Sequence, residues 1–180
     1  MKYTRENVGN LYNKPYNFEF FWGHSPSDDG RLTNTCFSQW WICWFKEHGV
    51  LFNCAEQYMM YQKAMLFKDN YIASKILDEL DPKEIKKFGR KVRNFDEKTW
   101  EDNRERIVVN GNRLKFGQNE DLKSYLLKTG SKILVEASPY DDIWGIKLRS
   151  SDRRSLKVEQ WQGLNLLGFA LMEVRDELSN

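Results

Sequence analysis

The sequence has few cysteines and few histidines. Its three cysteines, Cys36, Cys43 and Cys54, form neither a CxxC pair nor a zinc-ligand spacing, and only His24 and His48 could add imidazoles. We therefore expect no disulfide framework, no metal site and no cofactor. An odd number of unpaired thiols is typical of a reduced, cytoplasmic protein.

Long hydrophobic runs and an excess of one charge are also missing. No apolar stretch approaches the roughly 20 residues that cross a bilayer, and the first residues lack the apolar segment of a signal peptide. The 28 Lys and Arg residues nearly balance the 26 Asp and Glu residues, so the formal charge is only +2. This balance argues against a membrane partner and against a dedicated nucleic-acid-binding protein.

Aromatic side chains are abundant, at 14% of the chain with seven Trp. With 41% hydrophobic and 30% charged residues among 180, the composition predicts a folded protein and not a disordered one. There is no internal repeat and no low-complexity linker. We therefore expect a single domain over residues 1–180, with its core over about residues 17–178.

The pattern of apolar and turn residues predicts a mainly α (α+β) fold. A small antiparallel β element is expected near the N-terminus, from a strand over residues 17–22 and a hairpin with arms at 40–45 and 50–53. A helical core follows, with one buried strand at 132–137. The predicted helices cover residues 55–67, 71–80, 83–93, 96–116, 119–128 and 163–178. The loop over 138–162 is too long for a simple connection, and its content indicates an ordered, functional loop.

Two charged residues lie on one face of the first predicted helix. At 100° per residue, Glu56 and Lys63 are two turns apart on the same side as Met59, Met60 and Phe67. If this face is buried, desolvation and mutual pairing will change both pKa values, as catalytic acids, bases and nucleophiles require. The spacing alone favours the simpler interpretation of a solvated pair at the edge of the helix.

The long loop contains a carboxylate beside a large aromatic ring, in Asp142-Ile143-Trp144-Gly145. Trp can stack on a base or sugar, and Asp can bind ribose hydroxyls. Further on, Gly163 and Asn165 begin a helix whose free N–H groups could receive a phosphate. Taken singly, each of these features favours the simpler interpretation of a structural turn, a core Trp and a conventional Asn cap.

Two weaker candidates lie elsewhere in the chain. His24 could transfer protons, although an isolated loop histidine is more often structural or merely exposed. The cluster of Arg90, Lys91 and Arg93 would suit phosphates, although such runs usually form solvated faces.

Ordered blocks along nearly the whole chain together resemble the NADAR family, also called YbiA-like. They are Phe20-Phe21-Trp22-Gly23-His24, Leu32-Thr33-Asn34, Ser38-Gln39-Trp40-Trp41, Ala55-Glu56-Gln57-Tyr58-Met59-Met60 with Lys63-Ala64, Gly89-Arg90, Trp100, Gly111-Asn112 with Lys115-Phe116-Gly117, Val135-Glu136-Ala137-Ser138-Pro139, Asp142-Ile143-Trp144-Gly145-Ile146, and Gly163-Leu164-Asn165-Leu166-Leu167-Gly168 through Leu171-Met172-Glu173-Val174-Arg175. This resemblance reverses the preference for the structural interpretations, because the helix and the loop described above carry the site motifs of the family.

The resemblance implies an N-glycosidase that cleaves a C1′–N bond on a phosphorylated ribose. Family members act on ribosylamino-pyrimidine phosphate intermediates of riboflavin synthesis or remove ADP-ribose from guanine bases. The implied partner is thus a small ribosyl-phosphate or ADP-ribose molecule, or ADP-ribosylated nucleic acid. The resemblance implies catalytic roles for three residues and substrate binding for five. These are Glu56, Lys63 and Asp142, and then His24, Asn34, Trp144, Gly145 and Asn165.

The chain departs from the family pattern at two places. Lys147 replaces a Gly of the common Trp-Gly-Ile-Gly-Leu block and is followed by Arg149, Arg153 and Arg154; it could forbid a positive φ, impair catalysis or contact a phosphate. Gln57 replaces a common His, so no proton transfer is assigned there. Lys147 keeps open a second interpretation, a catalytically weakened ADP-ribose-binding module.

Overall fold

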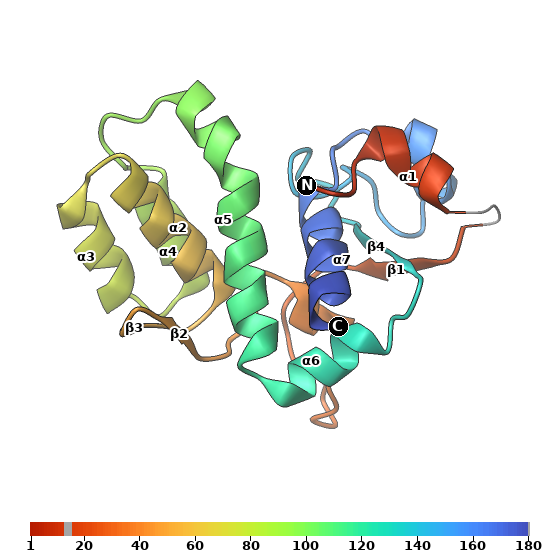
Figure 1. Cartoon of the computed structure of the whole chain (residues 1–180), viewed down its shortest axis with the longest axis horizontal. Coiled ribbons are helices and arrows are strands. Elements are labelled where there is room, and N and C mark those ends of the chain that lie inside the picture. Colours follow the sequence, from red (N-terminus) through yellow and green to blue (C-terminus); the bar gives the residue numbers. More distant parts are fainter. Residues whose placement is uncertain (13–15, 180) are drawn as a thin grey trace. The chain divides into compact units, whose positions relative to one another are not determined.

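The computed structural model of the chain describes residues 1–12 and 16–179 (Figure 1). The described chain is mainly helical, with two small two-stranded sheets, which confirms the predicted fold class. Its residues form two compact units, which we call the central unit (Gln39–Glu120) and the terminal unit (Met1–Ser38 with Asp121–Asn180).

The central unit begins with a hairpin. β2 (Phe45–Glu47) and β3 (Val50–Phe52) pair antiparallel, and His48 and Gly49 turn the chain between them with φ angles of 48° and 84°. Two successive positive φ angles form the tight turn that matches the twist of the strands. The predicted hairpin is confirmed, although its first arm begins at Phe45 and not at Trp40.

Four helices complete the central unit, and acidic side chains begin three of them. The helices are α2 (Ala55–Leu66), α3 (Asn70–Asp78), α4 (Pro82–Gly89) and α5 (Glu97–Gly117). Asp81 Oδ1 accepts a hydrogen bond from Lys83 N at 2.9 Å, and Asp96 Oδ1 accepts one from Thr99 N at 2.7 Å. These caps satisfy N–H groups that have no partner inside the helix, as the sequence predicted for both positions.

The helix predicted over residues 83–93 ends early, at Gly89. Arg93 lies outside this helix and is bound by Asp69. Asp69 Oδ2 accepts hydrogen bonds from Arg93 N at 2.9 Å and from Arg93 Nε at 3.0 Å. The next residue, Asn94, has a positive φ of 55°, which no right-handed helix contains. The prediction of helix beyond Gly89 was therefore wrong, because a tertiary ion pair fixes this segment.

Helix α5 runs through Gly111 without interruption, as predicted. A Cβ atom at Gly111 would lie 2.6 Å from Cδ1 of Tyr58 on α2. Real Cβ contacts of that length do not occur at protein packing density. The glycine therefore lets α2 and α5 approach closely enough to bury the face of α2.

The terminal unit contains the N-terminal and C-terminal segments. Its elements are α1 (Arg5–Leu11), β1 (Phe18–Phe21), η1 (Asn34–Phe37), α6 (Glu120–Leu127), β4 (Ile133–Glu136), η2 (Arg153–Leu156), η3 (Val158–Gln160) and α7 (Leu166–Leu178). β1 pairs in parallel with β4, so that Phe18 faces Ile133 and Phe21 faces Glu136 (Figure 1). The strand near residue 17 was expected in the antiparallel element, and the parallel pairing corrects that expectation. Helix α1 was not predicted.

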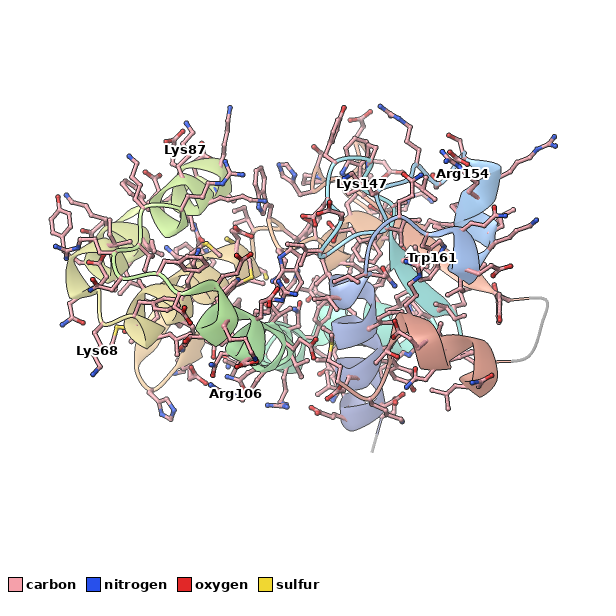
Figure 2. All side chains as sticks on the ribbon, turned by 90° about the horizontal axis from the view of Figure 1, so that it is seen from above. Lys68, Lys87, Arg106, Lys147, Arg154 and Trp161 are labelled. Atoms are coloured by element: carbon pink, nitrogen blue, oxygen red, sulfur yellow. The ribbon has the colours of Figure 1, made fainter. Side chains whose placement is uncertain are left out.

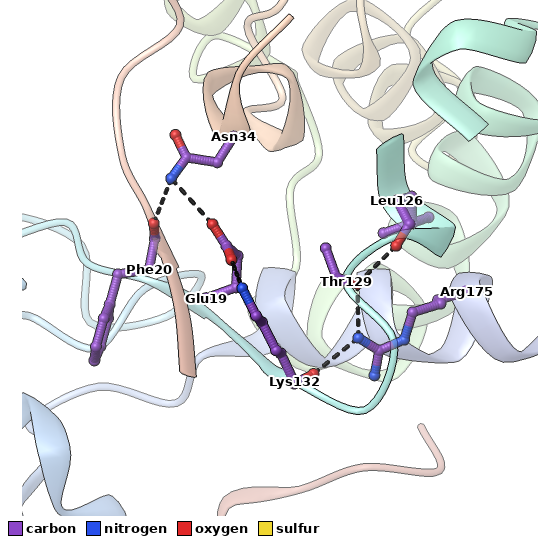
Figure 3. Close-up of polar contacts among 7 residues, drawn as sticks. All are labelled: Glu19, Phe20, Asn34, Leu126, Thr129, Lys132 and Arg175. Atoms are coloured by element: carbon purple, nitrogen blue, oxygen red, sulfur yellow. Dashed lines mark hydrogen bonds and ion pairs between the residues drawn. The ribbon is translucent and has the colours of Figure 1, made fainter. Parts of the chain in front are cut away.

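A buried arginine of α7 holds the turn that leads into β4 (Figure 3). Arg175 is 4% exposed, and its Nη1 donates to Thr129 Oγ1 at 2.9 Å and to Lys132 O at 2.8 Å. Thr129 Oγ1 in turn donates to Leu126 O at 2.6 Å. Because a buried guanidinium needs such partners, these bonds fix α7 against the segment that precedes β4.

The loop over residues 138–162 is ordered, as predicted, and includes η2 and η3. Trp161 is buried, and its Nε1 donates to Ser155 O at 2.7 Å; Figure 2 labels it in the terminal unit. The three cysteines are thiols and not disulfides, as expected, and all three are buried. Within residues 1–12 and 16–179, none of the helices has the length and apolar character needed to cross a bilayer.

Candidate functional site

Helix α2 carries the first predicted catalytic residue, Glu56, in its first turn. The side chain is 2% exposed, and the backbone N–H donates to Gln39 O at 2.9 Å. Asn112 of α5 is fully buried and donates from Nδ2 to Gln39 Oε1 at 3.0 Å. The backbone N–H of Glu56 and the side-chain amide of Asn112 thus both hold Gln39 in place. A carboxylate at a helix N-terminus is also stabilised by the helix dipole.

A buried lysine of α5 accompanies this carboxylate. Lys115 has no exposed surface, and its Nζ lies 5.0 Å from the centroid of the Phe116 ring. Burial raises the pKa of the Cys54 thiol to about 12; the Gln57 N–H and the charge of Lys115 lower this pKa, whereas the charge of Glu56 raises it. The charges of Glu56 and Lys115 therefore both change the pKa of the buried Cys54 thiol. A buried charge is costly unless a group of opposite charge or a hydrogen bond compensates it.

Lys115 was not among the predicted site residues. The only signal for it was its place in the block Lys115-Phe116-Gly117, which carries part of the family resemblance. A Lys between apolar residues of a helix does not reveal by itself that it is buried.

Lys63 lies two turns after Glu56 and is half buried. Its Nζ lies 4.3 Å from the Phe95 ring centroid and 5.4 Å from the Trp100 ring centroid. Burial lowers the pKa of the Lys63 amine, Glu56 raises this pKa by its charge, and Arg90 lowers it. Burial is the largest of these three causes. A lowered pKa increases the fraction of neutral, nucleophilic amine.

Gln57 has a structural role beside these residues. Its Oε1 accepts from Asn53 N at 2.7 Å, and its Nε2 donates to Ile76 O at 3.0 Å and to Glu79 O at 2.9 Å. The amide thus ties α2 to the end of α3. These contacts agree with assigning no proton transfer to this position.

The three residues of the predicted basic cluster, Arg90, Lys91 and Arg93, have different contacts. Arg93 is held by Asp69, and Lys91 Nζ lies 5.7 Å from the Phe88 ring centroid. Arg90 is the member that acts electrostatically on Lys63. Of this cluster, Arg90 is therefore the residue that remains next to the candidate site.

In the terminal unit, two neighbouring aspartates of the predicted site loop have different contacts. Asp141 Oδ1 accepts the N–H groups of Ile143 at 2.9 Å and Trp144 at 2.7 Å and so closes the turn. Asp142 is exposed, and its Oδ2 lies 2.8 Å from Lys147 Nζ. Hydrogen bonding and charge from Lys147 lower the pKa of Asp142, so the carboxylate stays ionised below its usual range.

Lys147 has a left-handed backbone conformation. Its φ is 55°, in the left-handed region that is costly for a side chain by about 1–2 kcal/mol. The backbone N–H donates to Asp141 O at 3.1 Å, and the neighbouring Ile146 N donates to Glu136 O at 3.0 Å. The Lys therefore does not forbid the positive φ, and it adds an ion pair to the predicted catalytic Asp142.

The start of α7 supports this loop and is not open to a phosphate. Leu164, Leu166 and Leu167 donate their N–H groups to the carbonyls of residues 142, 143 and 144 at 2.9, 3.2 and 3.1 Å. The expectation that a phosphate binds these N–H groups was wrong, because loop carbonyls use them. Gly163 permits this contact, since a Cβ there would lie 2.3 Å from Gly145 O.

Asn165 joins the loop to the sheet. Its φ of 57° is not helical, so α7 begins at Leu166, three residues after the predicted start at Gly163. The side chain is fully buried; Oδ1 accepts from Glu136 N at 3.0 Å, and Nδ2 donates to Leu134 O at 2.9 Å. Asn165 thereby fixes β4 beneath the loop that carries Asp142.

Asn34 and His24 flank β1. Asn34 Nδ2 donates to Phe20 O at 2.7 Å and lies 3.4 Å from Glu19 Oε1, while Glu19 Oε2 pairs with Lys132 Nζ at 2.6 Å (Figure 3). His24 is exposed in the loop that follows β1.

The predicted site residues therefore form two groups. Glu56 and Lys63 belong to the central unit, and the others belong to the terminal unit: His24, Asn34, Asp142, Trp144, Gly145 and Asn165. Among the described residues, no three His, Cys, Asp or Glu side chains are placed to hold a metal ion.

A comparison of the sequence with family models shows to which family the chain belongs. Residues 20–179, which include most of both compact units, match the model described as the NADAR domain. The chain belongs to the NADAR domain family. It is 47% identical to N-glycosidase R617 of Acanthamoeba polyphaga mimivirus over 146 residues, which are 78% of this chain and 86% of that protein.

Other relatives of this NADAR chain include a protein of solved structure. N-glycosidase YbiA of Escherichia coli (strain K12) is 31% identical over 87% of this chain and 86% of that protein. The NMR structure of the E. coli protein YbiA superposes with a TM-score of 0.71 at 28% identity, covering 91% of this chain and 85% of that one. A shorter match, 37% identical over 43% of this chain and 11% of the relative, is to the chloroplastic riboflavin biosynthesis protein PYRR of Arabidopsis thaliana.

Proposed function

We propose that this N-glycosyl hydrolase cleaves the C1′–N bond between a phosphorylated ribose and a base or amine. The names of its N-glycosidase relatives support the reaction, and the riboflavin biosynthesis relative supports a ribosylamino-pyrimidine phosphate as one substrate class. The other class is ADP-ribose joined to a guanine base. The observation that carries the proposal is the buried carboxylate of Glu56 on one helix with the half-buried Lys63, whose amine has a lowered pKa.

The chemistry follows from how charge develops in this reaction. As the C1′–N bond breaks, its electron pair leaves with the base nitrogen and positive charge builds on the ribose. A carboxylate in a site with little water stabilises that charge most strongly, which is the role proposed for Glu56. Asp142 is ionised at neutral pH and is proposed to bind the ribose or to orient water.

Lys63 is proposed as the nucleophile. Its neutral amine attacks C1′ while the base departs and takes a proton, and the sugar ring then opens to an imine between C1′ and Nζ. Water hydrolyses the imine, which releases the sugar and restores the amine. Burial is the largest cause of the lowered pKa of Lys63, and it favours the neutral amine that this step needs.

The remaining predicted residues are proposed to bind substrate or to support those that do. Trp144 is half buried beside Asp142 and offers a ring against the ribose or base. Asn34 and His24 are proposed to contact the polar part of the ligand. Gly145 and Asn165 act through the backbone of the loop, because Gly145 O accepts from Asn165 N at 3.1 Å.

A second candidate is an ADP-ribose-binding module with weak turnover. The ion pair between Lys147 and Asp142 favours it, because a carboxylate already paired with a cation has less negative potential to offer a developing positive charge. Saturable binding of ADP-ribose without release of a free base would support this alternative.

The test offers both substrate classes to the purified protein. ADP-ribosylated guanosine and a ribosylamino-pyrimidine phosphate are incubated separately, and products are resolved by mass. Release of free base establishes the reaction, and failure with both substrates contradicts it.

Sodium borohydride added during turnover should then trap a ribosyl adduct on Lys63. Lys63→Arg should abolish both trapping and turnover. Lys75→Arg is the matched control, since Lys75 also lies over an aromatic ring, Tyr71, but on the exposed face of α3. Full turnover in Lys63→Arg would leave Lys63 with a purely electrostatic role.

A further inference from the structure

The ring of Phe95 lies against the proposed nucleophile, and the reaction described above gives it no role. The ring centroid is 4.3 Å from Lys63 Nζ, and the Phe95 side chain is 45% exposed. A single exposed Phe is common on protein surfaces and needs no explanation by itself. An exposed ring next to a reactive amine is different, because a ligand that reaches the amine must also meet the ring.

Both ends of the short segment that carries Phe95 are fixed. Before it, Arg93 donates to the buried Asp69 from N at 2.9 Å, from Nε at 3.0 Å and from Nη2 at 2.6 Å. After it, Asp96 Oδ1 accepts from Thr99 N at 2.7 Å and from Thr99 Oγ1 at 2.6 Å. A segment held in this way loses little conformational freedom when it contacts a ligand.

The ring itself is oriented by a buried neighbour. Phe67, at the end of α2, is 8% exposed, and its ring centroid lies 5.3 Å from that of Phe95 with the planes at 60°. Aromatic pairs favour such edge-to-face contacts. Phe67 therefore fixes the Phe95 ring beside α2, the helix that carries Lys63.

The geometry of attack brings the leaving base to this ring. Lys63 Nζ must approach C1′ to roughly 3–3.5 Å, and the base nitrogen lies one single bond, roughly 1.5 Å, beyond C1′. The base therefore begins within about 5 Å of Nζ, and the Phe95 ring centroid is 4.3 Å from the same atom. Bases offer a flat π face to aromatic side chains, whereas ribose offers mainly hydroxyls.

Shielding of the amine does not require Phe95. Trp100 of α5 is half buried, and its ring centroid lies 5.4 Å from Lys63 Nζ. This less exposed ring also covers the amine. The exposed part of Phe95 is thus available to a ligand.

We propose that Phe95 is a specificity-determining residue whose ring stacks on the base that leaves from C1′. The inference rests on the proposed function and narrows it: the leaving group is a planar heteroaromatic base and not a simple alkyl amine.

The first test measures binding of two free leaving groups, guanosine and 5,6-diaminouracil, to the purified protein by calorimetry. Phe95→Leu keeps an apolar side chain but removes the ring, so it should weaken at least one of them by about 10- to 100-fold, the scale of base stacking. Tyr71→Leu is the matched control, because Tyr71 is also an exposed ring near a lysine, 5.8 Å from Lys75 Nζ. It should bind both compounds as the wild type does, and melting temperatures confirm that both variants are folded.

The second test uses ribose 5-phosphate, which carries no base. Its open-chain aldehyde condenses with the neutral Lys63 amine and loses water, and sodium borohydride reduces the resulting imine to a stable secondary amine. Phe95→Leu should form this adduct at the wild-type rate, since there is no base to stack. This readout separates contact with the base from placement of the amine.

The outcomes distinguish the inference from the proposed reaction. Phe95 has no part in base recognition if neither compound binds the wild-type protein, or if both bind Phe95→Leu equally well, even when base release proceeds. A matching loss of sugar trapping in Phe95→Leu also overturns the inference, because Phe95 would then only position Lys63. Conversely, base binding that depends on Phe95 supports the inference even if neither substrate is hydrolysed, in which case only the proposed reaction fails.

Discussion

Replacing Gly163 by alanine should displace the loop that carries Asp142. The added Cβ would lie 2.3 Å from Gly145 O, 2.8 Å from Asp142 Cα and 2.9 Å from Asp142 O. All three atoms belong to the backbone, so no side chain can rotate away. Because ordinary contacts between heavy atoms are roughly 3.5 Å, the two segments must separate by about 1 Å.

The magnitude of the effect follows from that displacement. The hydrogen bond from Leu164 N to Asp142 O, now 2.9 Å, would be lost or strongly bent. Overpacking of this kind costs about 1–3 kcal/mol of stability. A displacement of about 1 Å at a reacting group lowers rates by about a hundredfold. We therefore expect Gly163→Ala to remain folded with a lower melting temperature and to lose about two orders of magnitude in kcat/KM.

The assay compares base release and thermal unfolding in the same preparations. Gly9→Ala is the matched control: it makes the same change in α1 of the same unit, where the new methyl would meet only the Tyr16 hydroxyl, at 3.2 Å. It should leave the rate unchanged. A wild-type rate in folded Gly163→Ala would refute the reasoning, because the Asp142 loop would then have no part in catalysis.

Three further predictions concern charges. Glu56→Gln should keep its melting temperature and lose about a hundredfold in turnover, the scale of one well-placed electrostatic group; unchanged turnover would remove Glu56 from the site. Lys147→Gly removes the group that lowers the pKa of Asp142, so the acid limb of the pH–rate profile should move to higher pH, and an unmoved limb would show that Asp142 does not limit the rate. Asp69 has a pKa lowered chiefly by hydrogen bonds from Arg93, so the stability from this pair is present above the ordinary pKa of about 4 and is lost as pH falls toward the lowered value. Arg93→Gln should therefore lower the melting temperature at pH 7, with a difference that narrows below pH 4; a constant difference would contradict this origin.

Much of the fold could be predicted because its signals are local. Apolar spacing and the caps at Asp81 and Asp96 marked the helices, and the turn at His48 and Gly49 marked the hairpin. Each of these signals acts over a few residues. The end of α4 could not be predicted, because it depends on Asp69, which is 24 residues from Arg93.

For the site, the sequence by itself determined which motifs are present and therefore the family. It also placed Glu56 and Lys63 on one helical face, because 3.6 residues per turn requires it. Only the tertiary structure decided which of these groups are buried or already bonded. Lys115 is buried by the packing of α5, and Lys147 is paired with Asp142. Burial and long-range pairing arise from segments far apart in the chain, and they set the pKa values on which the chemistry depends.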